Sequence, residues 1–179
     1  MQANKILVVD DFITDQTQNF ICQQLQAEAV PWCFLPDVTH SDKEKRNVGF
    51  AHTPFKDGSV QSTAYWFLYP ILLAACDKNN IIVKQLLRIR IGLYVNKSSS
   101  TTHQRHVDNP MPHLVGLYYV DDSDGDTVFY KDGVSDEELM RCTPKKGRMV
   151  LFDGAIYHAS TSPVEKTHRM TVNFNFLSE

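Results

Sequence analysis

The sequence predicts a mainly β protein of the α+β class, in which a sheet sandwich or barrel is flanked by helices. The first observation behind this prediction is a change of pattern near Leu86, after which the chain contains a series of short, partly alternating apolar segments. Alternation with a period of two is typical of half-buried strands. The second observation is that both segments with helical features precede Leu86. Strands gathered in one half and helices in the other favour separate layers over an alternating βαβ order.

The first half is expected to contain one strand, two helices and one long loop. The β-branched run KILVVDDF over 5–12 predicts the strand, and 14–29 predicts a helix that Thr14 can cap. The second helix is expected over 64–77. Residues 36–62 are polar, contain Gly and Pro and have no clear period, so we interpret them as a loop. Loops of this length are uncommon in compact domains unless they are lids or binding segments.

The second half is expected to consist of short strands joined by turns. The segment DDSDGD at 121–126 contains Asp-Gly, which is a hairpin signal. Its glycine offset and its lack of a terminal glutamate do not fit a calcium-binding EF-hand loop, so a hairpin turn is the better interpretation. The expected strands are 86–95, 113–120, 126–133, 147–154, 155–161 and 169–177.

Length and composition narrow the class of protein. The chain has 179 residues, of which 42% are hydrophobic and 22% charged, so we expect one globular domain over 1–179 with a core that needs no disulfides. Within it, 1–85 would supply the strand, the helices and the lid-like loop, and 86–179 the sheet core. The net charge of −3 predicts neither nucleic acid nor a membrane surface as a partner.

The apolar segments and the cysteines predict a cytoplasmic protein. The longest apolar run, 64–76, is too short to span a bilayer and contains a proline. The first residues lack the long apolar region of a secretory signal. The four cysteines show no CxxC spacing and no pairing pattern, so free thiols in a reducing compartment are expected.

A metal site is indicated by the segment TTHQRHVDNPMPH over 101–113. In extended backbone, residues i and i+2 point to the same side, so His106 and Asp108 would direct an imidazole and a carboxylate toward one point. His158 in a later strand could add a second imidazole. Two histidines and one carboxylate are the facial triad of non-haem iron(II) oxygenases. The alternative is that His106 and Asp108 only hydrogen-bond in a loop while His158 packs in the core.

A fourth residue strengthens the interpretation of a polar cavity. In RMTVNFNF, alternation assigns Arg169, Thr171, Asn173 and Asn175 to one face and the apolar residues to the other. A buried arginine is costly unless it pairs with an anion, and the carboxylate of a ligand is its natural bidentate partner. The alternative is a structural salt bridge between Arg169 and one of the chain's aspartates.

Four separate motifs resemble one family. The chain resembles the iron(II)- and 2-oxoglutarate-dependent dioxygenases, and within them the prolyl 4-hydroxylase group that includes the hypoxia-factor prolyl hydroxylases. The likeness covers about 86–177, and RHVDNP is a particularly close match. Small members of this kind are common in bacteriophage genomes, so the resemblance also suggests a phage-encoded protein acting in a host cytoplasm. The motifs are YVNKSSSTTHQRHVDNP, LYYVDDSDGDTVFY, PKKGRMVLFDGAIYHAS and HRMTVNFNF.

The resemblance implies a fold, a ligand set and cosubstrates. The implied fold is a double-stranded β-helix, the jelly-roll layout of cupins, packed against the N-terminal helices. It further implies Fe(II), with 2-oxoglutarate and O2 as cosubstrates and ascorbate as reductant. The implied iron ligands are His106, Asp108 and His158. The implied 2-oxoglutarate residues are Arg169 for the distal carboxylate, Tyr119 for a hydrogen bond to the same group, the pocket residue Tyr94, and Thr171.

The activity implied is hydroxylation of a prolyl residue at carbon 4 in a peptide or protein. A free amino acid or another small metabolite is the alternative substrate, because none of the iron or cosubstrate residues specifies proline. A non-catalytic cupin-like binding protein and a nucleic-acid demethylase are less favoured. The demethylases of this superfamily usually carry a second arginine late in the last core strand, and RMTVNFNF has none.

Several remaining residues are expected to have ordinary roles. His103, His113 and His168 match no ligand position and are interpreted as loop or surface histidines, although His103 and His113 are near enough in sequence to be alternative ligands. Trp32 and Trp66 are expected in the core. In the lid-like segment and the helix after it, Phe50, Phe55, Tyr65 and Trp66 are also available to grip an extended proline-rich peptide, which would bind with little loss of entropy.

Overall fold

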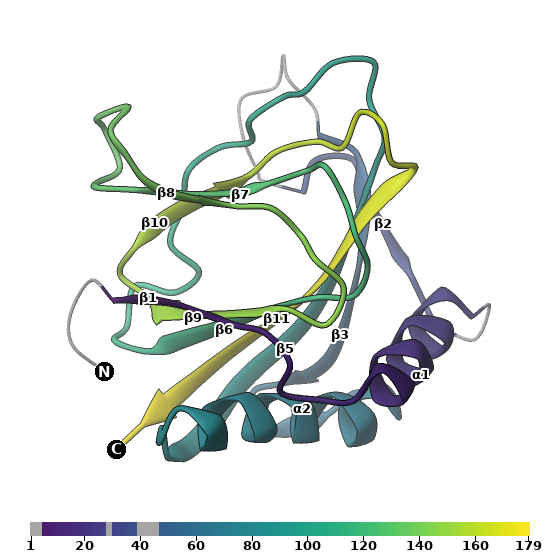
Figure 1. Cartoon of the computed structure of the whole chain (residues 1–179), viewed down its shortest axis with the longest axis vertical. Helices are drawn as coiled ribbons and strands as arrows, with labels where there is room; N and C mark the ends of the chain where they lie inside the picture. The colour runs from purple at the N-terminus through teal and green to yellow at the C-terminus, as the bar shows by residue number, and fades with distance from the viewer. Residues whose placement is uncertain (1–4, 28–29, 39–46) are drawn as a thin grey trace.

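The computed structural model describes residues 5–27, 30–38 and 47–179. Two antiparallel sheets face each other, and two helices cover the outer face of the larger sheet (Figure 1). The prediction of a mainly β protein with flanking helices is therefore confirmed. None of the described helices combines the length and the apolar character needed to cross a membrane.

The larger sheet has eight strands. Along it they run in the order β1-β9-β6-β11-β5-β3-β2, and β4 pairs with β3. Every neighbouring pair is antiparallel. The strands are β1 (Ile6–Val9), β2 (Cys33–Leu35), β3 (Gly49–Lys56), β4 (Ser59–Val60), β5 (Val83–Val95), β6 (Leu114–Tyr119), β9 (Met149–Asp153) and β11 (His168–Ser178).

The smaller sheet has three strands and lies opposite the part of the large sheet that contains β6 and β9 (Figure 1). Its order is β10-β7-β8, again antiparallel. These strands are β7 (Thr127–Tyr130), β8 (Glu138–Cys142) and β10 (Tyr157–Ser160). Strand β8 was not among the expected strands, because its sequence ELMRC is short and has no clear alternation.

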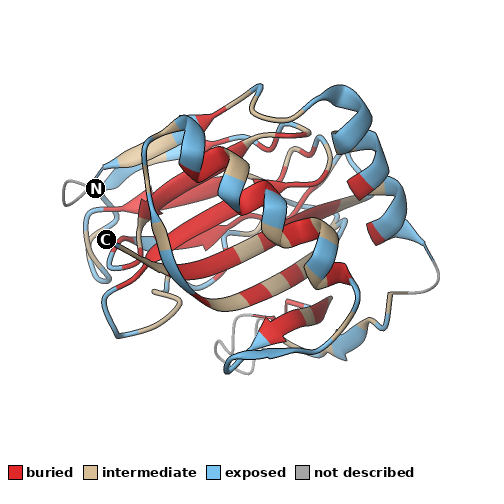
Figure 2. Ribbon diagram, turned by 90° about the horizontal axis from the view of Figure 1, so that it is seen from below, coloured by how far each residue is buried: buried red, intermediate tan, exposed pale blue. Residues whose placement is uncertain are grey.

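The helices are α1 (Asp15–Gln26) and α2 (Ala64–Lys78), close to the expected ranges. Thr14 caps α1, because its hydroxyl accepts a hydrogen bond of 3.2 Å from the backbone N–H of Thr17. Helix α2 lies across the strands of the large sheet and turns its buried side toward them (Figure 2). Its apolar side chains therefore form one layer of the core.

Alternation along β6 and β11 divides the core into two clusters. On β11, Met170, Val172, Phe174 and Phe176 pack in the cluster beneath the helices. On β6, which is buried along its whole length, alternate residues belong to the two clusters. Those that face the small sheet are Val115, Leu117 and Tyr119. The middle of the large sheet, at β6 and β11, is thus buried on both sides, and the polar side of β11 faces the space between the sheets rather than solvent.

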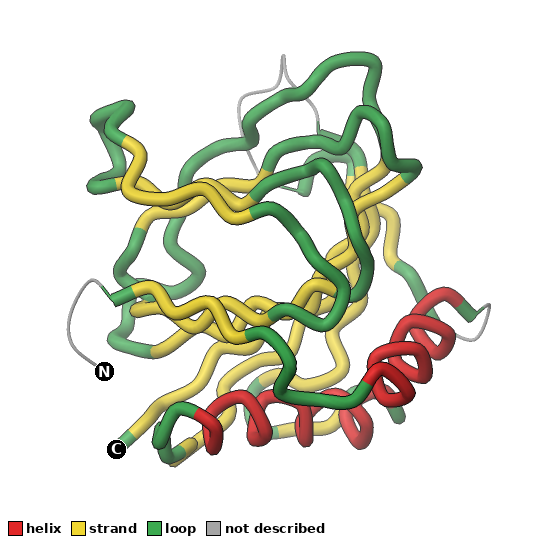
Figure 3. Tube along the Cα trace, viewed as in Figure 1, coloured by secondary structure: helices red, strands yellow, loops and turns green. Residues whose placement is uncertain are grey.

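The prediction of one loop over 36–62 is wrong for much of its length. Residues 49–56 form β3, which pairs with β5, and 59–60 form β4 (Figure 3). Part of the segment, 39–46, lies outside the described residues. The strand was missed because GFAHTPFK contains a proline and interrupts its alternation, and a register shift between His52 and Phe55 accommodates this irregularity.

The aromatic residues of this region do not all lie where they were expected. Trp66 has 67% of its surface exposed and is not a core residue, whereas Trp32 is partly buried against the core. Phe55 is buried and stacks on Tyr65, at 5.3 Å between ring centroids. Both of these rings are therefore engaged in packing and are not free to grip a peptide.

The hairpin predicted at 121–126 is also wrong. The strands on either side, β6 and β7, belong to different sheets, so this segment crosses from one sheet to the other. The carboxylate of Asp124 accepts hydrogen bonds from the backbone N–H groups of Val164 and Glu165, both at 2.8 Å. Position 125 requires glycine because the backbone of Thr161 lies close to it. A Cβ at Gly125 would lie 2.7 Å from the carbonyl oxygen of Thr161. An Asp-Gly pair can serve either geometry, and tertiary contacts decide between them.

Candidate active site

The two histidines of the expected metal site are joined by their backbones. His106 and His158 form an isolated antiparallel bridge, in which each backbone N–H donates to the other's carbonyl oxygen at 3.0 Å. The paired residues direct their side chains to the same side, and the ring centroids lie 4.6 Å apart. His158 is held in β10, whereas His106 belongs to the irregular segment before β6. The bridge therefore fixes a loop histidine against a strand histidine.

Hydrogen bonds to backbone carbonyls select one tautomer of each ring. The Nδ1 atom of His106 lies 3.1 Å from the carbonyl oxygen of Gln104, and Nδ1 of His158 lies 3.1 Å from that of Ile156. A carbonyl oxygen only accepts, so Nδ1 carries the proton in both rings. The Nε2 atoms are then left with free lone pairs. This is the usual arrangement of histidines that bind a metal through Nε2.

Asp108 is oriented by three side chains from the large sheet. Its Oδ2 atom accepts hydrogen bonds from the amides of Asn173 at 2.8 Å and Asn175 at 3.0 Å. Its Oδ1 atom accepts a bond of 3.3 Å from Arg88 and lies 3.9 Å from Nε2 of His106. The amides therefore hold one oxygen while the other faces the histidine rings.

The electrostatics of the site favour a neutral histidine beside an ionised carboxylate. Burial, together with the nearby charges of His106 and Arg169, lowers the pKa of His158 to about 4, even though Asp108 opposes this shift. Burial tends to raise the pKa of Asp108, but His158, Arg88 and the two asparagine amides outweigh it and lower that pKa well below its usual range. Both groups are therefore in the protonation state of a metal ligand at neutral pH.

The three side chains meet the requirements of a divalent metal. One ligand atom from each of His106, Asp108 and His158 lies within 4.8 Å of the other two. Imidazole nitrogen with carboxylate oxygen is a donor set that suits ferrous iron, and three protein ligands leave further coordination positions open. The residues therefore fit the metal that the sequence motif predicted.

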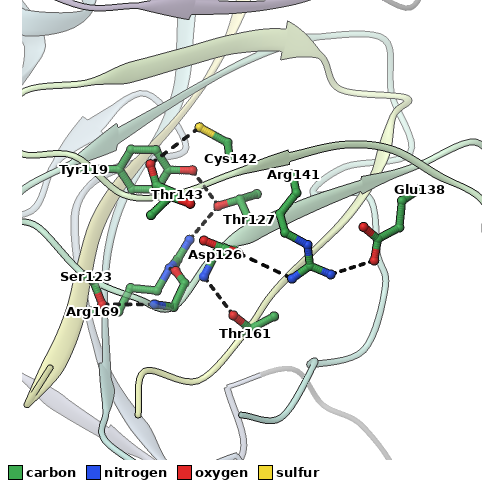
Figure 4. A network of polar contacts seen from close by, with 11 residues as sticks. Tyr119, Ser123, Asp126, Thr127, Glu138, Arg141, Cys142, Thr143, Thr161 and Arg169 are labelled. Atoms are coloured by element: carbon green, nitrogen blue, oxygen red, sulfur yellow. Dashed lines mark hydrogen bonds and ion pairs between the residues drawn. The ribbon is translucent and has the colours of Figure 1, made fainter. Parts of the chain in front are cut away.

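Arg169 lies in the same cavity and is only 2% exposed. Its Nε atom donates to the carbonyl oxygen of Gly125 at 2.6 Å. Its Nη2 atom donates to the hydroxyl of Thr127 at 2.7 Å (Figure 4). The guanidinium also lies 5.5 Å from the centroid of the Tyr94 ring. Within the described part of the chain no carboxylate forms an ion pair with Arg169, so the structural salt bridge considered above is not seen there.

The expected cosubstrate residues divide into two groups. Tyr94, Arg169 and Thr171 line the cavity together with the three metal-site residues. Tyr119 does not line it, because its ring is fully buried behind Thr127 and its hydroxyl donates to that of Thr127 at 2.7 Å. The remaining lining residues are Arg90, Gly92, Leu117, Thr127, Ser160 and Asn173.

Comparison with solved structures identifies the fold, whereas comparison of sequences finds no match. No family model and no curated protein sequence matches the chain. Among solved structures, an oxidoreductase of the 2OG-Fe(II) oxygenase family from Burkholderia pseudomallei has a TM-score of 0.72 at 13% identity, covering 96% of this chain and 84% of that one. The chain has the fold of the 2OG-Fe(II) oxygenases. The prediction of a double-stranded β-helix is thereby confirmed.

Two prolyl hydroxylases share this oxygenase fold with the chain. The prolyl-4-hydroxylase of Pseudomonas putida has a TM-score of 0.63 at 16% identity, covering 98% of this chain and 94% of that one. The prolyl hydroxylase of Trichoplax adhaerens, in complex with a peptide fragment of hypoxia inducible factor, has a TM-score of 0.66 at 14% identity. Here the coverage is 97% and 84%. The resemblance seen in the motifs therefore extends to the fold.

The oxygenase fold also brings in residues that sequence reasoning did not select. Thr127 accepts hydrogen bonds from both Tyr119 and Arg169, which leaves its own O–H able to donate into the cavity. Alternation along β7 could not have identified it, because all four residues of the strand are buried. Arg88 and Arg90 were within the strand expected at 86–95, and their spacing of two residues was the available signal that both face one side.

His103 is a buried residue of this oxygenase fold, not a surface histidine. Its ring nitrogens bond to the hydroxyls of Ser160 at 2.8 Å and Ser162 at 2.9 Å, and its ring lies 4.9 Å from that of Tyr94. Burial, with the nearby charges of Arg169 and Lys97, lowers the pKa of His103 to about 3.

The other two unassigned histidines lie away from the metal-site cavity. His113 is buried, and its Nδ1 donates to the carbonyl oxygen of Met111 at 2.7 Å, so it is not a surface residue either. His168 is half-buried and pairs with Asp121 at 2.6 Å. Neither belongs to the group of side chains that could hold the metal.

Proposed function

We propose that this chain is an iron(II)- and 2-oxoglutarate-dependent hydroxylase. The observation that carries the proposal is the meeting of His106, Asp108 and His158 with Arg169 in one cavity. A metal site alone would fit many proteins, and a buried arginine alone would fit a structural role. Their combination, with donors suited to ferrous iron beside a guanidinium free to take a carboxylate, fits the binding of a metal together with a keto acid.

Each residue of the site would have a distinct role. His106, Asp108 and His158 hold the metal, while Asn173 and Asn175 keep the carboxylate turned toward it. Arg169 binds the distal carboxylate of 2-oxoglutarate. The hydroxyl of Thr127 and the ring of Tyr94 border the same guanidinium. Thr171 lines the cavity beside them, and Tyr119 supports the group by orienting Thr127.

Bound ferrous iron would supply the oxidative chemistry, in which O2 converts 2-oxoglutarate to succinate and carbon dioxide and delivers one oxygen atom to a substrate C–H bond. The contribution of the chain is to orient the two substrates and to exclude water. The inner wall of the cavity serves that purpose, because Leu117 and Thr127 are buried and Tyr119 closes the space behind them.

For the substrate, we propose a prolyl residue of a peptide or protein, hydroxylated at carbon 4. Support comes from the RHVDNP motif and from two structural neighbours that are prolyl hydroxylases, one of them in complex with a peptide. A free amino acid or another small metabolite is the alternative, because the residues around the metal do not select a proline ring.

The test is to incubate the protein with Fe(II), ascorbate and 2-oxoglutarate, and with proline-containing peptides, free proline or host lysate. A gain of one oxygen atom on a peptide, accompanied by succinate, is the expected result. Oxygen gain on free proline but never on peptide would overturn the peptide substrate and leave the hydroxylase intact. A chain that binds iron and 2-oxoglutarate but never forms succinate would be a binding protein. Demethylation of a methylated oligonucleotide would favour the nucleic-acid alternative.

A further inference from the structure

A second arginine lies in the cavity and has no role in holding the metal or Arg169. Residues at every second position of β5 face the cavity, and among them are Arg90, Gly92 and Tyr94. Arg90 is half-buried and pairs in register with Asn173 of β11, whereas Tyr94 pairs with Arg169. Along β5, Arg90 is four positions from Tyr94, the register partner of Arg169. Four positions of extended strand correspond to about 13 Å of backbone. They therefore enter the cavity at different points.

Arg90 differs from the neighbouring arginines in having no partner among the described residues. Arg88 bonds to Asp108, and Arg169 bonds to Gly125 and Thr127. Across the described ranges, Arg90 makes no ion pair and no side-chain hydrogen bond. A guanidinium has five N–H donors, and those of Arg90 stay accessible, since none of its nitrogens is among the buried side-chain atoms that lack a hydrogen-bond partner. They are therefore available to a ligand that supplies an acceptor.

The lining of the cavity indicates the charge of that ligand. Asp108 is its one acidic residue among those described, and that carboxylate is already engaged by Arg88 and two amides. Arg90 and Arg169 both contribute positive charge. Since 2-oxoglutarate would be bound through Arg169, the positive charge of Arg90 remains to attract a second anion.

The position of Arg90 points to the substrate. Besides the metal-site cavity, it lines a groove over β3 and β4, to which Leu35, His52, Thr53 and Gln61 also contribute. Because Arg90 lines both spaces, it lies where a molecule in the groove and the metal-site cavity meet the same side chain. The groove also contains Lys56, whose ammonium faces Asp57 at 3.7 Å on the surface. Lys56 is therefore already partnered, whereas Arg90 has no ion-pair partner among the described residues.

We infer that Arg90 binds a carboxylate of the substrate, so that the hydroxylase is selective for substrates with a carboxylate near the reacting carbon. The inference rests on the proposed function and narrows its substrate class. A planar guanidinium matches a carboxylate through two parallel hydrogen bonds. The carboxylate could be the α-carboxylate of a free amino acid, the C-terminus of a peptide, or an acidic side chain beside the modified residue.

Acid and amide pairs provide the test. L-Proline is compared with L-prolinamide, and blocked proline peptides with Asp, Glu or a free C-terminus are compared with their Asn, Gln or amide counterparts. Binding is measured by anaerobic calorimetry on protein loaded with Ni(II) and 2-oxoglutarate, and turnover by succinate release with Fe(II). The wild type is expected to bind the acid of at least one pair ten-fold or more tighter than its amide. A preference for L-proline over L-prolinamide would identify a free amino acid as the substrate, and a preference within a peptide pair would identify a peptide.

Variants connect the preference to Arg90. R90Q should bind acid and amide with equal affinity, and R90K should keep part of the preference because it retains charge without the planar pair of donors. K84Q, which removes an exposed charge from the same strand, is the matched control and should behave as wild type. Thermal melts of each variant report whether it folds. If R90Q does not fold, the comparison rests on R90K.

Four outcomes would overturn the inference. These are an equal affinity of the wild type for acid and amide in every pair, binding of no member of any pair, an acid preference that persists in R90Q, and loss of 2-oxoglutarate binding in R90Q. The last would mean that Arg90 holds the cosubstrate. In each of these cases a wild type that still forms succinate from 2-oxoglutarate leaves the proposed function standing. Failure to bind iron and 2-oxoglutarate at all would instead refute the proposed function.

Discussion

His106 and His158 donate a backbone N–H to each other's carbonyl oxygen, both at 3.0 Å, and this bridge brings their rings together. The same segment is tied to β10 and the residues after it at further points, because Thr102 bridges Thr161 and the backbone N–H of His103 donates to the carbonyl oxygen of Ser160 at 2.9 Å. A metal bound between the rings would add to these contacts between the loop and the small sheet. Metal binding and local folding of the segment around His106 are expected to be coupled for this reason.

Removal of either histidine should abolish metal binding. H106A and H158A each leave two ligands, which lowers affinity and destroys the geometry. The expected result is no detectable Fe(II) binding in anaerobic calorimetry and no succinate formation. H168Q, which alters a histidine outside the cavity, is the control and should bind iron normally. Normal turnover in both alanine variants would refute the assignment of His106 and His158 as metal ligands.

Removal of the guanidinium of Arg169 should weaken 2-oxoglutarate binding selectively. Truncating one partner of a buried charge pair costs about 2–5 kcal/mol, which corresponds to roughly 30-fold to several-thousand-fold in affinity. R169A should therefore require far more 2-oxoglutarate while its Fe(II) affinity remains close to that of the wild type. R141Q changes an exposed arginine that pairs with Glu138 and serves as the control. An unchanged cosubstrate requirement would mean that the carboxylate binds elsewhere.

Thr127 should matter more to stability than Tyr119. T127V leaves two buried donors, Tyr119 and Arg169, without their acceptor, at about 1–3 kcal/mol each. Y119F removes one hydrogen bond, at about 0.5–1.5 kcal/mol. Urea denaturation of the metal-free protein should therefore show a larger loss of unfolding free energy for T127V. T127S retains the hydroxyl and should stay close to wild type, and equal losses in T127V and Y119F would show that Arg169 does not depend on this acceptor.

The amides that hold Asp108 should control metal affinity. N173A and N175A each remove one hydrogen bond to Oδ2, which frees the carboxylate to turn away from the histidines. Loss of such supporting contacts typically lowers metal affinity 10- to 100-fold. Competition with a fluorescent chelator measures the change. N79A, which alters an amide at the end of α2, should not affect binding. Unchanged affinity in both site variants would show that Arg88 alone orients Asp108.

His103 should make stability depend on pH. Its pKa falls from an ordinary value near 6.5 to about 3 in the folded protein, so the unfolded chain binds a proton that the folded chain does not. The unfolding free energy is therefore expected to fall as pH is lowered from about 6.5 toward 3, by at most about 1.4 kcal/mol per pH unit from this group. H103Q should flatten the slope in denaturation series of metal-free protein. An identical slope would mean that His103 titrates normally.

His168 should act in the opposite direction. Its hydrogen bond to Asp121 raises its pKa, so its contribution to stability is present below about pH 6.5 and is lost as pH rises through the raised value. H168Q should remove this loss, which is seen as a smaller decline of stability above neutral pH. The same denaturation series measures it. A decline that is unchanged in H168Q would assign the pH dependence to another group.

The predictions that failed did so because contacts between segments distant in the sequence outweighed the local sequence pattern. The Asp-Gly pair at 124–125 has the form of a hairpin turn, yet the chain crosses between sheets there because Asp124 is bonded to the backbone before β11. Residues 49–56 lack regular alternation, yet they form β3 because β5 offers them a free edge with which to pair. His103 has no apolar neighbours in sequence, yet it is buried between two serines.

The sequence by itself determined the class of fold and the identity of the central polar residues. Alternation on β11 assigned Arg169, Thr171, Asn173 and Asn175 to one face, and the H-x-D motif directed two donors the same way, because strand geometry makes these relationships local. Only the tertiary structure decided that Tyr119 contacts the cavity through Thr127, that Asn173 and Asn175 hold Asp108, and that Arg90 has no partner in the part of the chain that the structure describes. These facts depend on distances between segments that meet only when the sheets close, and such distances have no signature in a single sequence.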